Sequence, residues 1–340
     1  MPRILVTPRS VTSHGHPALK RLQACGYEVV LGPAGRQPTE SELLSLLPGC
    51  VGFLAGGETG SARGLAAAAP MLRAISRNGT GSDSIDLPAS KMLGVEILTA
   101  AGANARGVAE LTLGLLLALA RGIVAGNTSV KNGGWERSPG FELEGRTLGV
   151  LGYGNVGRRV AELARGFGMR VIVHDPALPA ASTNTTTTTT SSTTTFAAAT
   201  HPVAATSGTG SLPPAVSFAA SAAEVIRSAQ VLTLHCPPAV DLRPLLDRSA
   251  LASMRRGSYV INTARFDLID EAAVLDALDS GQLAGLALDV FSQEPPVGSA
   301  LAAHPRVITT PHIGGFTQES VDRAMEAAVT NLIAALGSQP

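Results

Sequence analysis

A short apolar strand that runs into a glycine-rich turn constrains this chain more than any other feature. The strand is predicted over 147–151, and an amphipathic helix is predicted over 158–168. Between them, Gly152 permits a tight bend, Gly154 lets the backbone approach a pyrophosphate, and Gly157 lets the helix pack closely on the strand. The first helical turn would then present N–H groups and a positive dipole end to the phosphates.

An acidic residue supports a dinucleotide site at this turn. The next predicted strand, 170–174, ends at Asp175, 18 positions after Gly157, where a carboxylate can accept hydrogen bonds from the adenosine ribose. The alternative, a glycine-rich turn without a ligand, explains the glycines of a chain that has 37 of them but does not explain Asp175. Asp175 repels a 2′-phosphate, and Pro176 follows it where an NADP enzyme would place Arg. The sequence therefore predicts NAD.

Strands and helices alternate along most of the chain, which indicates an α/β fold with parallel sheets and helices on both faces. A length of 340 residues exceeds what one hydrophobic core usually serves, so two domains are expected. The first set of strands is predicted at 4–7, 28–31, 51–54, 73–76 and 95–98. The second is predicted at 147–151, 170–174, 231–235, 258–262, 286–290 and 307–309.

Three further segments stand out. A helix is predicted over 105–125; it is apolar almost all round and is expected to be buried between domains or subunits. A final helix over 317–336 is expected to return to the first domain. Residues 178–215 are rich in Thr and Ser and offer no periodic apolar face, so a poorly ordered surface insertion is predicted there.

Composition limits the possible partners. The chain has 26 basic and 26 acidic side chains, so no basic field attracts nucleic acid or anionic lipid. The most apolar run, 111–120, is too short to cross a bilayer. Three isolated cysteines argue against a disulfide framework and against zinc, and fit a reducing compartment. The sequence predicts a cytoplasmic protein with a small-molecule partner, no metal, no nucleic acid and no membrane.

Three polar residues follow predicted strands in the second half of the chain. Arg265 follows 258–262, Glu294 lies in a proline-stiffened loop, and His312 follows 307–309. Taken singly, each has a structural alternative: a surface arginine, a solvated glutamate and a structural histidine. In an open α/β sheet, however, the carboxyl ends of the strands face the ligand crevice, so all three can converge there.

These segments resemble the D-2-hydroxyacid dehydrogenase family, which includes D-3-phosphoglycerate dehydrogenase, glyoxylate/hydroxypyruvate reductase and D-lactate dehydrogenase. The resemblance extends to 75–86, 102–111, 134–137 and 234–237. It implies two Rossmann-like domains with an active-site cleft between them. The substrate domain would be 1–99 plus 316–340, and the NAD-binding domain 100–315. The resemblance also implies a homodimer joined through the NAD-binding domain.

The resemblance implies roles for the three polar residues. Arg265 would bind the substrate carboxylate and carbonyl. His312 would be the general acid and base, and Glu294 would orient it and favour its imidazolium. The loop of Asn78, Gly79 and Thr80 would present backbone N–H groups to the substrate carboxylate.

The resemblance also implies a set of cofactor-binding residues. Thr80 and Asp289 would approach the nicotinamide, and His235, Cys236 and Pro237 would line the adenosine side. The full set is Thr80, Gly152, Gly154, Asn155, Val156, Gly157, Asp175, Pro176, His235, Cys236, Pro237, Thr263, Ala264, Arg265, Asp289, His312 and Gly314.

The sequence departs from the family at Phe266, where relatives commonly have Gly, so a narrowed pocket is expected there. Arg137 could meet a substrate phosphate across a dimer. With no regulatory domain after residue 340, a short, unregulated enzyme of the phosphoglycerate or glyoxylate/hydroxypyruvate type is expected. The alternative is an NAD-sensing binding protein of the C-terminal-binding corepressor type. Formate and phosphite dehydrogenases share the scaffold, but nothing in the sequence favours their substrates.

Overall fold

The computed structural model describes residues 1–178, 215–239, 241 and 243–338. The chain forms two compact units, one of Met1–Leu111 with His312–Pro340 and the other of Thr112–Pro311. The predicted insertion at 178–215 lies outside the described residues except at its two ends. Each unit is a parallel α/β structure, as the alternation of strands and helices predicted.

The first unit holds a five-stranded parallel sheet in the order β2-β1-β3-β4-β5. Neighbouring strands are in register, so that Ala55 at the end of β3 is opposite Arg77 at the end of β4. The polar loops that follow these strands therefore emerge at one edge. The strands are β1 (Arg3–Val6), β2 (Glu28–Leu31), β3 (Cys50–Ala55), β4 (Ala74–Arg77) and β5 (Glu96–Thr99).

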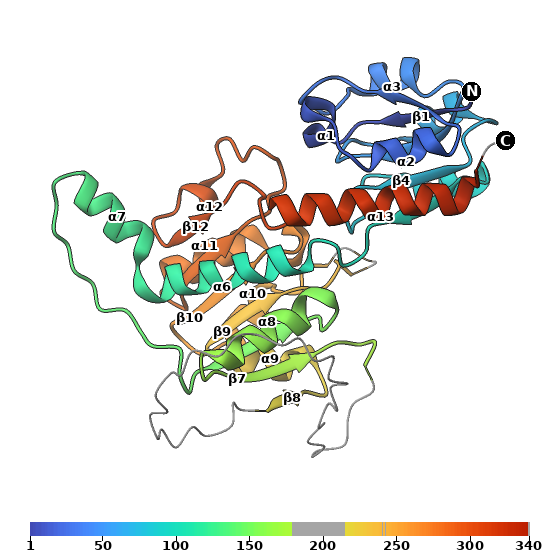
Figure 1. The fold of residues 1–340 in the computed structure, drawn as a ribbon. Coiled ribbons are helices and arrows are strands. Elements are labelled where there is room, and N and C mark those ends of the chain that lie inside the picture. The colour runs from blue at the N-terminus through green and yellow to red at the C-terminus, as the bar shows by residue number, and fades with distance from the viewer. Residues whose placement is uncertain (179–214, 240, 242, 339–340) are drawn as a thin grey trace, which may run out of the picture. The chain divides into compact units, whose positions relative to one another are not determined.

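Helices cover both faces of this sheet (Figure 1). One face packs on α1 (Arg9–His14), α2 (Leu19–Ala24) and α13 (Gln318–Leu336). The other packs on α3 (Glu40–Leu46), α4 (Ala62–Ala68) and α5 (Leu87–Met92). Because α13 contacts β3, β4 and β5, the end of the chain returns to the first unit, which confirms the prediction for the final helix.

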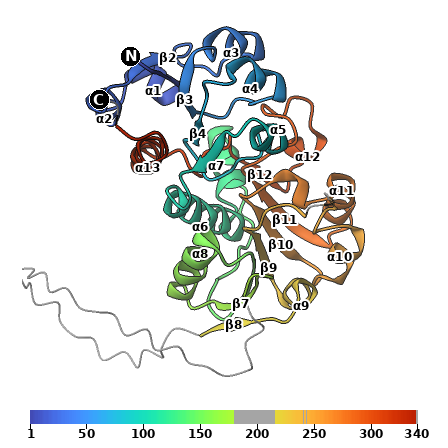
Figure 2. The ribbon, with the colours of Figure 1, turned by 90° about the vertical axis from the view of Figure 1, so that its right-hand side faces the viewer.

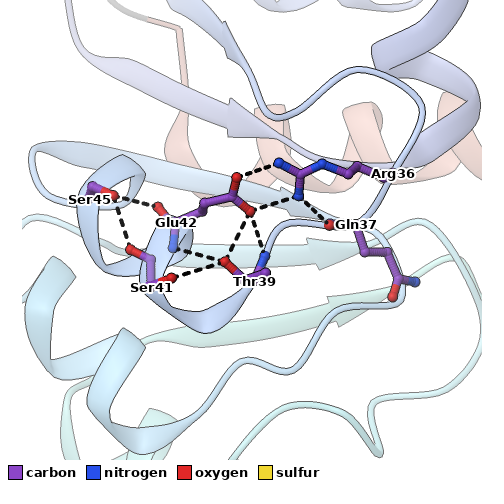
Figure 3. A network of polar contacts seen from close by, with 6 residues as sticks. All are labelled: Arg36, Gln37, Thr39, Ser41, Glu42 and Ser45. Carbon is purple, nitrogen blue, oxygen red and sulfur yellow. Dashed lines mark hydrogen bonds and ion pairs between the residues drawn. The ribbon is translucent and has the colours of Figure 1, made fainter.

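The start of α3 shows how local polar contacts set an element boundary (Figure 3). The Thr39 hydroxyl accepts a hydrogen bond from the Glu42 backbone, and Glu42 accepts one from the Thr39 backbone, which is a capping box. Arg36 clamps the same carboxylate with two nitrogens. Hydrogen bonds from Arg36 and from Thr39 lower the pKa of Glu42 to about 2. This carboxylate therefore stays ionised, and keeps capping the helix, at a lower pH than an ordinary glutamate does.

The second unit holds a seven-stranded parallel sheet in the order β12-β11-β10-β9-β6-β7-β8. The change of direction at β6 is the topological switch at which such sheets bind nucleotides. The strands are β6 (Thr147–Leu151), β7 (Arg170–His174), β8 (Val216–Phe218), β9 (Val231–Leu234), β10 (Ser258–Asn262), β11 (Leu283–Leu288) and β12 (Val307–Thr309).

Figure 2 shows helices on both faces of the second sheet. One face carries α6 (Ala105–Arg121) and α8 (Asn155–Gly166). The opposite face carries α9 (Ala222–Ser228), α10 (Arg248–Ser253) and α11 (Glu271–Asp279), which pack into the main apolar cluster of this unit. Two short helices, η1 (Phe266–Leu268) and α12 (Ala300–Ala303), lie in the loops after β10 and β11.

The prediction of a single buried helix over 105–125 is wrong at its end. The helix stops at Arg121, Gly122 adopts φ 59°, and α7 (Ile123–Lys131) begins at an angle of 63° to α6. Glycine takes this left-handed conformation without the penalty of a Cβ atom. No residue of α7 is buried. In the described part of the chain no single helix is long and apolar enough to span a membrane, and only α6 and α7 taken together meet that test.

Candidate dinucleotide and substrate sites

The three glycines after β6 have different surroundings. Gly152 has φ 92°, and a Cβ atom there would lie 2.5 Å from the His235 carbonyl. A Cβ atom on Gly157 would lie 2.0 Å from the Gly152 oxygen. Gly154, in contrast, has no atom of the described residues within 4 Å of an added Cβ. Two glycines thus serve close packing, and the third leaves room for a ligand to approach the backbone.

The helix that follows begins without a side-chain cap. Gly154 is the N-cap of α8, and no side chain caps its first turn. The N–H groups of that turn, beginning at Asn155 and Val156, therefore point out of the helix end, where a phosphate can accept hydrogen bonds from them.

Asp175 is held at the mouth of this turn. Its Oδ2 accepts a hydrogen bond from the Tyr153 backbone N–H at 2.7 Å, and its Oδ1 accepts one from the Ala177 N–H at 2.9 Å. These bonds fix the carboxylate beside the glycine turn, and each oxygen retains a further lone pair for a ribose hydroxyl. Together with the open space at Gly154, this arrangement fits the adenosine half of NAD. Pro176 follows on the surface.

The segment after β9 faces the same turn. His235 donates its backbone N–H to the Leu151 carbonyl, and its Nε2 lies 2.9 Å from the Thr233 hydroxyl. Burial lowers the pKa of His235 to about 3 and raises the pKa of the Cys236 thiol. Both side chains are therefore uncharged at neutral pH. The role of His235, Cys236 and Pro237 on the adenosine side stays a prediction.

The loop after β10 holds Arg265 in place through a residue that sequence analysis missed. The Asn262 side chain accepts a hydrogen bond from the Ala264 N–H at 3.0 Å and donates one to the Arg265 carbonyl at 2.7 Å. The Thr263 hydroxyl pairs with Thr112 of α6 at 3.1 Å. The Arg265 guanidinium donates to the Ala264 carbonyl at 2.8 Å. Asn262 thus determines the shape of the loop that carries the arginine.

Asp289 lies beside this loop. It is 1% exposed, and its N–H donates to the Asn262 carbonyl. Its Oδ1 accepts a hydrogen bond from the Thr310 hydroxyl at 2.6 Å, a contact that the sequence did not predict. Glu294 is exposed in the loop after β11, and its Oε1 accepts a hydrogen bond from the Phe291 N–H at 3.2 Å. The loops after two neighbouring strands therefore carry these residues: Arg265 follows β10, and Asp289 and Glu294 follow β11.

His312 has the backbone of a constrained residue. It is exposed and has φ 52°, the only positive φ among the described residues other than glycine. Its loop continues to Gly314, whose carbonyl packs against Gly107 so closely that a Cβ atom there would lie 2.8 Å away. His312 and Gly314 belong to the first compact unit, whereas Arg265 and Glu294 belong to the second. The meeting of the three predicted catalytic residues stays a prediction.

The predicted substrate loop follows β4 in the first unit. The Asn78 N–H donates to the Ala55 carbonyl at 2.9 Å, so it is already engaged and does not face a substrate as predicted. The Gly79 carbonyl accepts a hydrogen bond from the Ala100 N–H at 2.9 Å. Thr80 is exposed. In the described ranges no group of three or more His, Cys, Asp or Glu side chains could hold a metal ion.

These features define a class of protein, a parallel α/β fold that binds a dinucleotide at the switch point of its sheet. The profile described as "D-isomer specific 2-hydroxyacid dehydrogenase, NAD binding domain" matches residues 113–212 and 203–314. The chain belongs to this family. The predicted family, fold class and NAD cofactor are thereby confirmed.

Individual relatives agree with this assignment. D-3-phosphoglycerate dehydrogenase of Rattus norvegicus is 35% identical over 316 residues, which are 92% of this chain and 53% of that protein. Hydroxypyruvate reductase of Thermotoga maritima is 32% identical over 303 residues, which are 88% of this chain and 89% of that protein. The crystal structure of the TT0316 protein from Thermus thermophilus has a TM-score of 0.80 at 33% identity, covering 98% of this chain and 96% of that one. The chain spans about half the length of the D-3-phosphoglycerate dehydrogenases.

Proposed function

We propose that this chain is an NAD-dependent oxidoreductase acting on a small D-2-hydroxy or 2-oxo acid, of the phosphoglycerate or glyoxylate/hydroxypyruvate type. The observation that carries the proposal is the similarity to hydroxypyruvate reductase of Thermotoga maritima, which spans nearly all of both chains. The glycine turn after β6 and Asp175, which fit the adenosine half of NAD, support the proposed cofactor. The relatives are dehydrogenases, so the alternative of an NAD-sensing corepressor is not favoured.

Three side chains carry the proposed chemistry. NAD, held by the glycine turn after β6 and by Asp175, would supply the hydride chemistry at carbon 2 of the acid when bound. Arg265 pairs its planar guanidinium with the substrate carboxylate and carbonyl. His312 gives a proton to the carbonyl oxygen as the hydride arrives, and takes it back when the hydroxy acid is oxidised. Glu294 would accept a hydrogen bond from the far ring nitrogen and so orient the imidazole toward the substrate.

The backbone of His312 supports its role. A residue other than glycine in the left-handed region costs stability and persists only where the surrounding structure enforces it, which happens most often at functional sites. The loop of Asn78, Gly79 and Thr80 would hold the substrate from the first unit. Asp289, fixed by Thr310, would approach the nicotinamide.

The test is NADH oxidation with glyoxylate, hydroxypyruvate, pyruvate and 3-phosphohydroxypyruvate. We expect turnover with at least one acid. His312→Gln should lower kcat by roughly a hundredfold or more, as expected for loss of a general acid, while the Kd for NADH changes little. His14→Gln, at an exposed histidine of the same unit, is the matched control and should keep full activity. No turnover by the wild-type protein would reject the proposal.

The proposal includes a homodimer in the cytoplasm. Residues 122–140, the arm of this molecule, are almost entirely exposed and carry Ile123, Val130 and Trp135, whose exposed fractions are 54%, 56% and 79%. Figure 1 shows α7 and the loop after it extending away from the second sheet. A hollow of about 700 Å³ lies between α6, α7 and the β10–β12 strands. Apolar surface of this kind favours association. The three cysteines are free, as expected in a reducing compartment.

A further inference from the structure

Several buried polar atoms of the first unit have no hydrogen-bond partner among the described residues. They are Glu58 Oε2, Ser76 Oγ, Asn78 Oδ1 and Ser84 Oγ. Buried polar atoms in folded proteins are nearly always paired, so a group of unpaired ones needs a reason. All four lie on β4 or in the loops that follow β3 and β4. This is also where the proposed substrate loop begins.

Glu58 is the most unusual of them because it is a carboxylate only 4% exposed. Its Oε1 accepts hydrogen bonds from the Thr7 hydroxyl and from the Gly56 N–H, the latter at 2.9 Å. Its Oε2 lies beside Gly56, where an added Cβ would approach it to 2.8 Å, and has no donor. One oxygen is therefore fixed by the protein, and the other keeps its full capacity to accept.

The loops of Glu58 and Asn78 run side by side. The Asn78 N–H donates to the Ala55 carbonyl at one end, and the Gly60 N–H donates to the Ser84 carbonyl, at 2.8 Å, at the other. Asp86 in turn donates its N–H to the Gly60 carbonyl at 2.9 Å. The two loops are thus tied together at both ends, at the carboxyl edge of the sheet.

The unpaired atoms of Glu58 and Asn78 are both acceptors, since a carboxylate and an amide oxygen cannot donate. Arg77 of the same edge directs its Nε to the Gly81 carbonyl at 3.0 Å. A ligand that satisfies these acceptors must bring a hydrogen-bond donor. A phosphate on the substrate would instead bring its negative charge close to the Glu58 carboxylate. Like charges placed together in a partly desolvated site disfavour binding.

We infer that Glu58 determines substrate specificity: it favours a 2-oxo acid with a hydroxyl on carbon 3 and disfavours one with a phosphate there. This inference rests on the proposed function and narrows it. It separates the hydroxypyruvate type from the phosphoglycerate type, two types that the family assignment alone leaves together.

The test compares kcat/KM for hydroxypyruvate and for 3-phosphohydroxypyruvate. The wild-type protein should prefer hydroxypyruvate by at least about tenfold, the ratio that one well-placed polar group supplies. Glu58→Gln keeps the size of the side chain and removes its charge, so the preference should fall by about tenfold. Glu96→Gln, at an exposed glutamate of β5, should keep the wild-type ratio. An unchanged ratio in Glu58→Gln would overturn the inference, because the charge of Glu58 would then have no effect on the choice between the two acids.

Two outcomes separate this inference from the proposed function. Glyoxylate has no carbon 3, so its turnover tests the dehydrogenase activity alone. A wild-type protein that reduces glyoxylate but prefers the phosphorylated acid would overturn the role of Glu58 and leave the proposed function intact. The absence of turnover with every acid would overturn both. If Glu58→Gln does not fold, the kcat/KM ratio of the wild-type protein for the two acids tests the inference by itself.

Discussion

Gly157 has no room for a side chain, and this affects both the packing of α8 on the turn and the binding of NADH. The Cβ of an alanine there would lie 2.0 Å from the Gly152 oxygen, so either α8 or the turn must move. We expect Gly157→Ala to weaken NADH binding by at least about tenfold and to lower the free energy of unfolding by about 1–3 kcal/mol.

Gly166 of the same helix is the matched control. An added Cβ there meets nothing within 4 Å, so Gly166→Ala should leave NADH binding unchanged and raise helix stability by up to about 1 kcal/mol. Isothermal titration and urea denaturation measure both effects. Equal NADH affinity in the two variants would contradict the close packing described for Gly157.

His235 makes stability depend on pH. Burial lowers its pKa in the folded protein to about 3, whereas the unfolded chain has a value of about 6.5. As the pH falls below 6.5, the unfolded state therefore binds a proton that the folded state does not bind, and the free energy of unfolding decreases. Between pH 6.5 and 4.5 this contribution amounts to about 2 kcal/mol.

Replacing His235 with Gln should remove that part of the pH dependence. The measurement is urea denaturation at pH 7 and pH 4.5 for the wild type, His235→Gln and the exposed-site control His14→Gln. We expect the control to follow the wild type. A wild-type slope retained in His235→Gln would show that other groups cause the acid sensitivity.

At the scale of elements, α13 packs along the sheet of the first unit and contacts β3, β4 and β5. Met325, Val329 and Leu332 of this helix are fully buried against the strands. An added Cβ at Gly52 of β3 would lie 2.8 Å from the Leu336 side chain, which shows how closely the helix approaches the sheet. The last residues of the chain therefore complete the core that the first residues begin.

Leu332→Ala should accordingly destabilise the protein by about 2–5 kcal/mol, because it leaves a cavity in a packed core. Thr330→Ala, two residues away on the exposed side of the helix, should change the free energy of unfolding by less than about 0.5 kcal/mol. Chemical denaturation compares the two variants. Similar losses in both would mean that α13 is stabilised by its own propensity and not by packing on the sheet.

At the scale of the whole molecule, the arm at 122–140 gives the proposed dimer a sharp test. The chain has one tryptophan, Trp135, and its side chain is 79% exposed. If the arm docks on a second copy, Trp135 fluorescence should shift to the blue as the concentration rises through the dimer Kd. Trp135→Ser should raise that Kd by roughly tenfold or more, as for an aromatic anchor.

Sedimentation velocity measures the effect on assembly, and Met92→Ser provides a control at another strongly exposed apolar residue, in the first unit. A dimer that persists unchanged in Trp135→Ser would place the interface elsewhere. Arg137, on the same arm, would then lose its proposed approach to a substrate phosphate.

Most strands could be predicted from the sequence because their signal is local. The strands at 28–31, 147–151, 170–174, 258–262 and 307–309 agree with the structure residue for residue. The edge strand β8 was missed, since three residues next to a Thr-rich stretch carry no recognisable period. The bend at Gly122 was missed because the apolar residues on either side of it form one continuous run in the sequence. Such a run does not show that the residues before the bend are buried and those after it are exposed.

The sequence alone determined most of the strands, the glycine turn and the acid after it, because each is marked by residues that lie close together in the chain. Only the tertiary structure decided that Asn262 shapes the Arg265 loop, that Thr310 holds Asp289, and that Glu58 keeps one oxygen unpaired. The contacts of Asp289 and Glu58 depend on which loops the sheet brings together at its edge, and those of Asn262 depend on the exact path of its own loop. Hydrogen bonds of these kinds leave no periodic trace in the sequence.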